Sequence, residues 1–139
     1  MLQEQLPAAP VVLVLENDVL LRLVTAGSLR EAGSGFEVLE AANSAEAMLV
    51  LASMPVDALF SDIDMPGKMD GLALAQWVRQ RRLDTRIILT SGVARALGGA
   101  EEYASFLAKP YADTDVEHLL RSVLPKAQTR ALQVRAIRH

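Results

Sequence analysis

Residues 58–78 read ALFSDIDMPGKMDGLALAQWV, and they carry the clearest indication of the fold class. The apolar run Ala58–Phe60 is short and is followed by polar residues, which is typical of a buried strand. The turn residues Met65–Gly67 come next, and apolar residues then return at helical spacing from Leu72 to Val78. The stretch therefore predicts a strand, a loop and a helix in succession.

The same alternation recurs along the chain. Further strands are expected at Val11–Leu15, Phe36–Leu39, Arg86–Leu89 and Ser105–Ala108. Apolar helix stripes are expected at Leu20, Leu23, Val24 and Gly27, at Ala45, Met48, Leu49 and Ala52, and at Val116, Leu119, Leu120 and Val123. Asn43 with Glu46, and Asp70, stand where helix caps are expected. Strands alternating with helices predict right-handed βαβ units and hence an α/β fold with a parallel sheet.

The segment between Ser91 and Ser105 departs from this alternation. Gly92, Gly98 and Gly99 interrupt any helical pattern there, so we expect the fourth helix to be short or irregular. The chain divides into a flexible lead over residues 1–10, one domain over 11–124 and a basic tail over 125–139.

Composition limits the functions that the chain can have. The 139 residues are 51% hydrophobic, and 14 Lys and Arg against 17 Asp and Glu give a net charge of −3, which disfavours nucleic acid as a partner. The absence of cysteine excludes disulfides and thiolate metal sites. No apolar run approaches the ~20 residues that span a bilayer, so we expect a cytoplasmic protein. His118 and His139 lack partners at the spacing of metal ligands or triads and are interpreted as structural or surface residues.

Polar residues follow the first, third, fourth and fifth of the expected strands. The carboxyl ends of parallel strands share one edge, where ligands bind, so Glu16, Asp62, Ser91 and Lys109 are expected to converge. Carboxylate oxygens suit Mg²⁺, and a lysine suits a phosphate. Taken singly, Asp18 is more simply a helix cap, Lys109 a solvated loop residue and Ser91 a turn hydroxyl. Only their joint arrangement indicates a site.

Four segments together resemble the receiver domain of two-component response regulators. They are VLVLENDVLLR (12–22), LFSDIDMPGKMDGLALA (59–75), IILTSG (87–92) and FLAKPY (106–111), within a match spanning Val11 to Leu124. The resemblance implies a doubly wound, flavodoxin-like sheet of five parallel strands in the order 2-1-3-4-5. It also implies a domain that takes a phosphoryl group from a histidine kinase or a histidine phosphotransfer protein.

The resemblance assigns roles to individual residues. Asp62 matches the phosphoacceptor, and Lys109 matches the lysine that pairs with the phosphoryl group. Ser91 and Phe106 match the hydroxyl and the aromatic ring that move on activation. The Mg²⁺ ligands would be Glu16, Asn17, Asp62 and the backbone carbonyl of Asp64, and Pro110 would follow a cis peptide bond.

Three features depart from the family pattern. Asn17 stands where a second acid is usual, so one negative charge is missing and Mg²⁺ binding is expected to be weaker. Gly67 and Lys68 make the loop after Asp62 one residue longer than its commonest form. The short stretch from Ser91 to Lys109 reduces the fourth helix, part of the usual signalling face, so partner recognition is expected to use other surfaces.

We therefore expect a single-domain switch that signals through protein contacts and is not an enzyme beyond its own phosphorylation and dephosphorylation. The chain could equally be a receiver detached from a hybrid kinase. A phosphorylation-independent interaction module with a weakened metal site is the alternative that Asn17 raises, and an enzyme acting on a small-molecule phosphate is a third hypothesis. The basic tail is either a solvated end or a helix that packs on a second subunit in a homodimer.

Overall fold

The computed structural model describes residues 9–31, 35–82, 84–94 and 96–124. The elements are β1 (Val11–Leu15), α2 (Val19–Glu31), β2 (Glu37–Ala41), α3 (Ser44–Ser53), β3 (Ala58–Asp62), α4 (Gly71–Arg81), β4 (Arg86–Ser91), the 3-10 helix η1 (Ala100–Glu102), β5 (Ala104–Ala108) and α5 (Asp113–Val123). Strand β1 has the predicted bounds, and the ends of the other strands differ from the predicted ones by at most two residues. Most of the expected lead, the whole expected tail and His139 lie outside the described residues.

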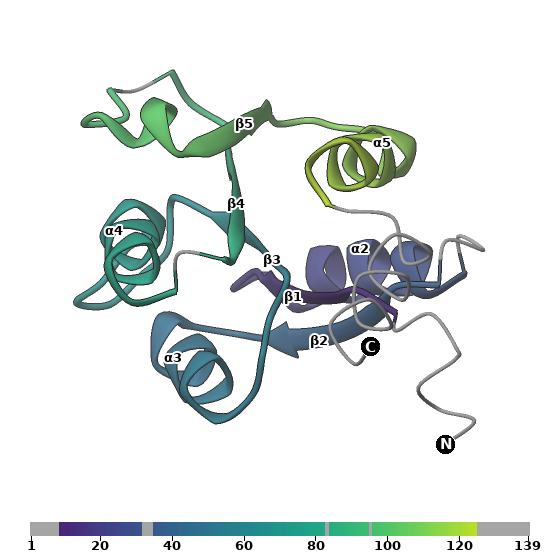
Figure 1. The fold of residues 1–139 in the computed structure, drawn as a ribbon. Helices are drawn as coiled ribbons and strands as arrows, with labels where there is room; N and C mark the ends of the chain where they lie inside the picture. Colours follow the sequence, from purple (N-terminus) through teal and green to yellow (C-terminus); the bar gives the residue numbers. More distant parts are fainter. Residues whose placement is uncertain (1–8, 32–34, 83, 95, 125–139) are drawn as a thin grey trace, which may run out of the picture.

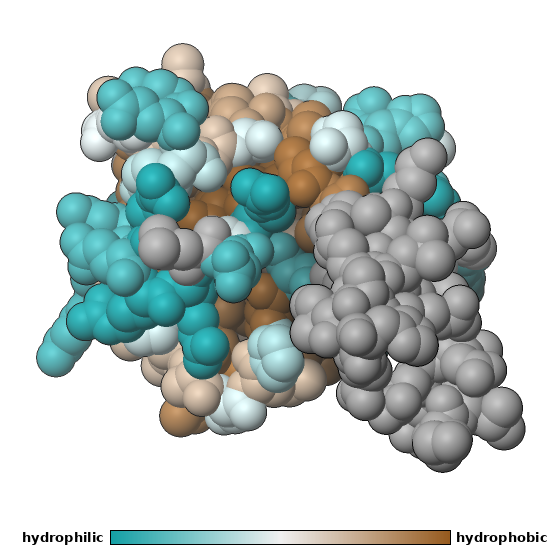
Figure 2. Space-filling view, in the orientation of Figure 1, coloured by the Kyte–Doolittle hydropathy of each residue, from teal (hydrophilic) through white to brown (hydrophobic). Residues whose placement is uncertain are grey.

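The five strands form one parallel sheet in the order β2-β1-β3-β4-β5, which confirms the predicted topology. Helices α2 and α5 cover one face of the sheet, and α3 and α4 cover the other (Figure 1). Alternate residues of the central strands point to opposite faces, so Val12 and Val14 pack under α2 and α5 while Leu13 and Leu15 pack under α3 and α4. Figure 2 shows hydrophobic residues gathered between the helical layers.

The predicted apolar stripe of α2 does not face the core. The helix buries Thr25, Ala26 and Leu29 instead, while Leu20 is 72% and Leu23 is 52% exposed. Apolar residues occur on more than one side of this helix, so their spacing alone does not orient it. The face of α2 that packs against the sheet is the one that carries the small Ala26 and the longer Leu29.

The stripe predicted for α3 is wrong in the same way. Ser44, Ala47 and Leu51 are buried, whereas Leu49 is 70% exposed. This helix is apolar nearly all round from Ala45 to Ala52, which removes the contrast on which an orientation depends.

The stripe of α5 is confirmed, because Val116 and Leu120 are fully buried and Leu119 and Val123 are half-buried beside them. His118 lies exposed on the same helix.

The predicted helix caps are confirmed. The side-chain oxygen of Asn43 accepts from the N–H of Glu46 at 2.9 Å, and that of Asp70 accepts from the N–H of Ala73 at 2.9 Å. Glu46 Oε1 accepts from the N–H of Ala42 at 2.8 Å. In the usual capping box it would accept from the N–H of the cap residue, here Asn43, so this is a variant of that motif.

The connection between β4 and β5 contains only η1 among its described residues, which confirms the short fourth helix. Gly98 and Gly99 adopt positive φ angles of 59° and 87° and so turn the chain immediately before η1. Strand β5 is consequently less covered than the other strands, and Phe106 is 43% exposed. No helix in the described ranges is long and apolar enough to cross a membrane.

Candidate functional site

Glu16, Asp62 and Lys109 meet at the carboxyl edge of the sheet. Glu16 directly follows β1 and Asp62 ends the neighbouring strand β3, so their carboxylates lie side by side. Lys109 follows β5, and its Nζ lies 3.1 Å from Glu16 Oε1 and 3.2 Å from Asp62 Oδ2. Both acids are only 5% exposed. One ammonium group thus partly neutralises two buried carboxylates, and the cluster keeps a net negative charge.

The charge state of Lys109 follows from this environment. Burial acts to lower the pKa of Lys109, but the hydrogen bonds and charges of Glu16 and Asp62 outweigh it and raise the pKa above its usual 10.5. The side chain therefore stays protonated at neutral pH. The stability that it contributes is present below its unfolded pKa and is lost only as the pH rises through the higher folded-state pKa.

The turn after β3 fixes the backbone around Asp62. Asp62 Oδ1 accepts from the N–H of Asp64 at 3.2 Å, and the N–H of Gly71 donates to the carbonyl of Ile63 at 2.9 Å. A Cβ on Gly71 would lie 2.2 Å from the carbonyl oxygen of Asp62. The first residue of α4 therefore has to be glycine for the helix to approach the strand this closely.

The turn after β1 positions Glu16. Its Oε2 accepts from the N–H of Asp18 at 3.0 Å, and its carbonyl accepts from Arg22 Nη1 at 2.9 Å. Asp18 in turn accepts from the N–H of Leu21 at 3.0 Å, so Asp18 caps α2, the simpler of its two interpretations. Asn17 lies exposed on this turn.

Ser91 and Phe106 lie beside the cluster, and the backbone carbonyl of Ser91 accepts from the N–H of Lys109 at 3.0 Å. The Oγ of Ser91 donates to Asp64 Oδ2 at 2.5 Å and accepts from the N–H of Val93 at 3.2 Å. Phe106 borders a hollow of about 350 Å³ that Leu97 and Ala108 also line. Ser91 and Lys109 line the same hollow, which therefore joins the cluster to the surface of β5.

The oxygen atoms at this edge fit the chemistry of Mg²⁺. This ion commonly uses one or two protein carboxylates and keeps waters and substrate phosphate in its remaining positions. Glu16 and Asp62 supply two carboxylates that already share one cation, Lys109. Within the described ranges no three or more His, Asp or Glu side chains are grouped so that they could hold a metal.

Sequence reasoning missed three residues that support the site. The hydroxyls of Tyr111 and Thr25 lie 3.3 Å apart, and the ring of Tyr111 packs edge-on against Phe60 with centroids 5.6 Å apart. Burial raises the pKa of Tyr111. Arg22 is the third, through its bond to Glu16. Tyr111 and Arg22 had a signal, since they stand in the matching segments FLAKPY and VLVLENDVLLR.

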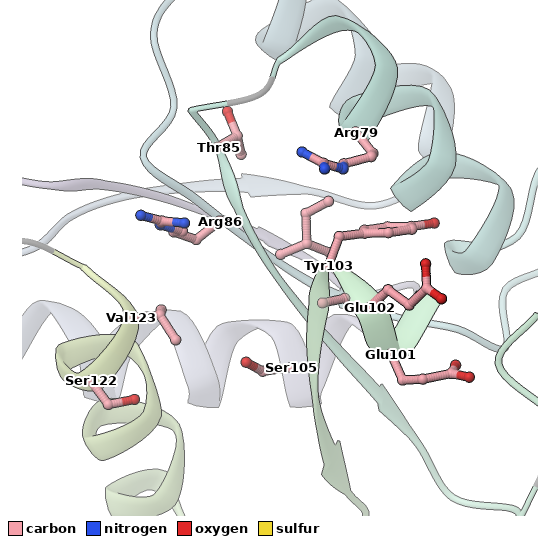
Figure 3. A pocket seen from close by; sticks show the side chains of 11 residues that line it. Arg79, Thr85, Arg86, Glu101, Glu102, Tyr103, Ser105, Ser122 and Val123 are labelled. Carbon is pink, nitrogen blue, oxygen red and sulfur yellow. The ribbon is translucent and has the colours of Figure 1, made fainter. Parts of the chain in front are cut away.

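A separate, larger pocket of about 590 Å³ lies at the opposite ends of β4 and β5 (Figure 3). Arg86 and Tyr103 line it, and the guanidinium of Arg79 lies over the Tyr103 ring, 5.8 Å from its centroid. None of the site residues predicted from the sequence lines this pocket.

The sequence pattern of the response regulator receiver domain matches residues 12–121 of the chain. The chain belongs to this family. The match includes every residue of the carboxylate–lysine cluster, and a receiver domain is a signalling module.

Curated relatives of this receiver domain are longer proteins. The DNA-binding transcriptional regulator NtrC of Escherichia coli is 34% identical over 133 residues, which cover 89% of this chain and 28% of NtrC. The aerobic respiration control protein ArcA of Escherichia coli is 30% identical over 123 residues, which cover 84% of this chain and 49% of ArcA. The chain thus spans between about a quarter and a half of these two relatives.

Solved receiver structures share the fold. The chemotaxis protein CheY4 of Vibrio cholerae is 26% identical with a TM-score of 0.75, and the match covers 84% of this chain and 100% of that one. The response regulator TrrA of Thermotoga maritima is 25% identical with a TM-score of 0.74, over 83% of this chain and 99% of that one. The TrrA structure is of a complex with Mg²⁺ and BeF.

Proposed function

We propose that this receiver domain accepts a phosphoryl group on Asp62 from a histidine kinase or a histidine phosphotransfer protein. The observation that carries the proposal is Lys109 Nζ within 3.2 Å of both Asp62 and Glu16. A buried carboxylate beside a protonated lysine can act as a nucleophile toward a phosphoryl group whose developing charge that lysine neutralises.

The transfer forms one bond to phosphorus and breaks another. A carboxylate oxygen of Asp62 bonds to phosphorus as the phosphorus–nitrogen bond of the donor phosphohistidine breaks. The leaving imidazole keeps the electron pair of that bond and takes up a proton. Lys109 stays protonated and moves its hydrogen bonds from the carboxylate to the phosphoryl oxygens. Glu16, Asn17, Asp62 and the carbonyl of Asp64 would hold Mg²⁺, which supplies further positive charge to the phosphoryl oxygens when bound.

The signal would begin at Ser91. Its hydroxyl now donates to Asp64 at 2.5 Å, and we expect it to turn to a phosphoryl oxygen once Asp62 is modified. Phe106 is expected to move into the adjoining hollow, which changes the exposed surface of β5. A downstream protein that binds only one of the two surfaces would read the change. The domain would thus act in the cytoplasm as a switch that signals by binding other proteins.

Intact-mass analysis after incubation with acetyl phosphate and Mg²⁺ tests the proposal. The natural protein and Asp70→Asn are expected to gain one phosphoryl group, and Asp62→Asn is expected to gain none. Asp70 is a matched control because it is an acid of the same loop whose role is to cap α4. Equal gain by Asp62→Asn and the natural protein would refute Asp62 as the acceptor.

Asn17→Asp is expected to tighten Mg²⁺ binding about tenfold, because a third carboxylate would face the ion. Isothermal titration with MgCl₂ measures the change. Asn43→Asp is the matched control, since it adds the same charge at an exposed helix cap on α3. An equal gain in Asn43→Asp, or none in Asn17→Asp, would mean that Asn17 is not a metal ligand.

Asn17 also favours a second candidate function, a docking module that works without phosphorylation. In that case the natural protein gains no phosphoryl group from acetyl phosphate, and Asn17→Asp restores the gain. That pair of results would replace the first proposal with the second.

A further inference from the structure

The outward face of α2 carries an apolar patch that nothing in the described residues covers. It consists of Val19, Leu20, Leu23 and Val24, which are 58%, 72%, 52% and 48% exposed. Single exposed apolar residues are common, but a contiguous row of four branched side chains on one helix usually marks a contact surface.

The patch runs into a groove between α2 and α5. The groove is shallow and open, has a volume of about 510 Å³ and is lined by Leu23 and Val24 and by the bare backbone of Gly27, where an added Cβ would meet nothing within 4 Å. Its rim is acidic, with Glu31 from α2 and with Asp113 and Glu117 from α5. Glu117 already pairs with Arg121 at 2.9 Å on the same helix. The groove therefore suits an occupant that is both basic and apolar.

Residues 125–139, here called the basic segment, have this chemistry. The segment contains Lys126, Arg130, Arg135 and Arg138 and no Asp or Glu, together with the branched apolar residues Leu132, Val134 and Ile137. It continues directly from α5, one of the two walls of the groove.

The path of the chain brings the basic segment to the groove. Leu124 is 8% exposed and belongs to the same buried cluster as Ala26 and Leu29 of α2, so the described chain ends within the layer that α2 and α5 form on the sheet. Helix α5 is about 16 Å long at ~1.5 Å per residue. Fifteen residues can extend roughly 50 Å, which is ample to turn back along it.

We propose that the basic segment folds back onto its own chain and occupies the groove between α2 and α5. Its guanidinium groups pair with Glu31 and Asp113 while its branched residues cover Leu23 and Val24. Tethering favours this occupant over a separate molecule, because a short linker gives an effective concentration in the millimolar range.

Disulfide trapping tests the proposal directly, because the natural chain has no cysteine. Ser28→Cys, in the groove wall, is combined with Thr129→Cys in the full-length chain. Equilibration with glutathione then gives the effective concentration of the two thiols. The matched control combines Thr129→Cys with Ser53→Cys, an exposed serine of α3 on the opposite face of the sheet. We expect the effective concentration in the groove pair to exceed that of the control at least tenfold.

Removing positive charge from the basic segment gives a second test of the proposal. Arg130→Gln, Arg135→Gln and Arg138→Gln together should reduce the advantage of the groove pair at least threefold. Gly27→Cys replaces Ser28→Cys should the latter fail to fold, since its Cβ has free space. Equal effective concentrations in groove and control pairs would overturn the proposal. So would preferential formation of disulfide-linked dimers, which would assign the groove to a second copy.

Discussion

Gly71→Ala is expected to lower the free energy of unfolding by about 3 kcal/mol, the upper end of the cost of overpacking. The added Cβ would lie 2.2 Å from the carbonyl oxygen of Asp62 and 2.7 Å from the Cα of Ile63. Both atoms belong to the backbone and cannot rotate away, so α4 or the end of β3 has to shift. Urea unfolding followed by circular dichroism measures the change.

Gly27→Ala is the matched control for this prediction. Gly27 also lies on a helix, but its Cβ would meet nothing within 4 Å, so alanine should stabilise α2 by up to about 1 kcal/mol through helix propensity. Opposite signs for the two variants are the expected result. A change of less than about 0.5 kcal/mol in Gly71→Ala would show that α4 does not approach Asp62 as closely as described.

Lys109→Met is expected to slow phosphorylation by acetyl phosphate about 100-fold, because it removes the positive charge nearest the transferred group. The same variant should also lose stability at pH 7.5, by about 1–3 kcal/mol, since Glu16 and Asp62 would remain buried without their shared cation. This range is below that for a fully buried pair because the Lys109 side chain is 23% exposed.

Urea midpoints at pH 7.5 measure the stability loss in Lys109→Met. Lys68→Met, which removes an exposed lysine from the neighbouring loop, should match the natural protein at this pH. A Lys109→Met midpoint equal to that of the natural protein at pH 7.5 would contradict the ion-pair account.

The sequence predicted the fold because two signals agree along most of the chain. Short apolar runs end in polar residues and are followed by helical spacing, and this alternation admits few topologies other than a parallel sheet. The orientation of α5 was predictable because polar residues separate its apolar stripe. That of α2 was not, because Leu20 and Leu23 look like core residues until the packing of Ala26 and Leu29 places them outside.

The meeting of Glu16, Asp62 and Lys109 was predictable from the shared edge of the sheet alone. The bond from Ser91 to Asp64 and the contact between Tyr111 and Thr25 were not. These contacts depend on side-chain rotamers and on packing between elements far apart in the chain, and no spacing rule encodes either. Spacing therefore predicted which strand ends converge, and the structure was needed to show which atoms pair.

Borohydride reduction of the phosphorylated protein tests the central claim most directly. An aspartyl phosphate is an acyl phosphate, and borohydride converts it to the alcohol, which turns the modified aspartate into homoserine. Peptide mass mapping then identifies the position. We predict homoserine at residue 62 and aspartate unchanged at residues 18, 64 and 70. Homoserine at any of those three positions, with Asp62 intact, would contradict the account.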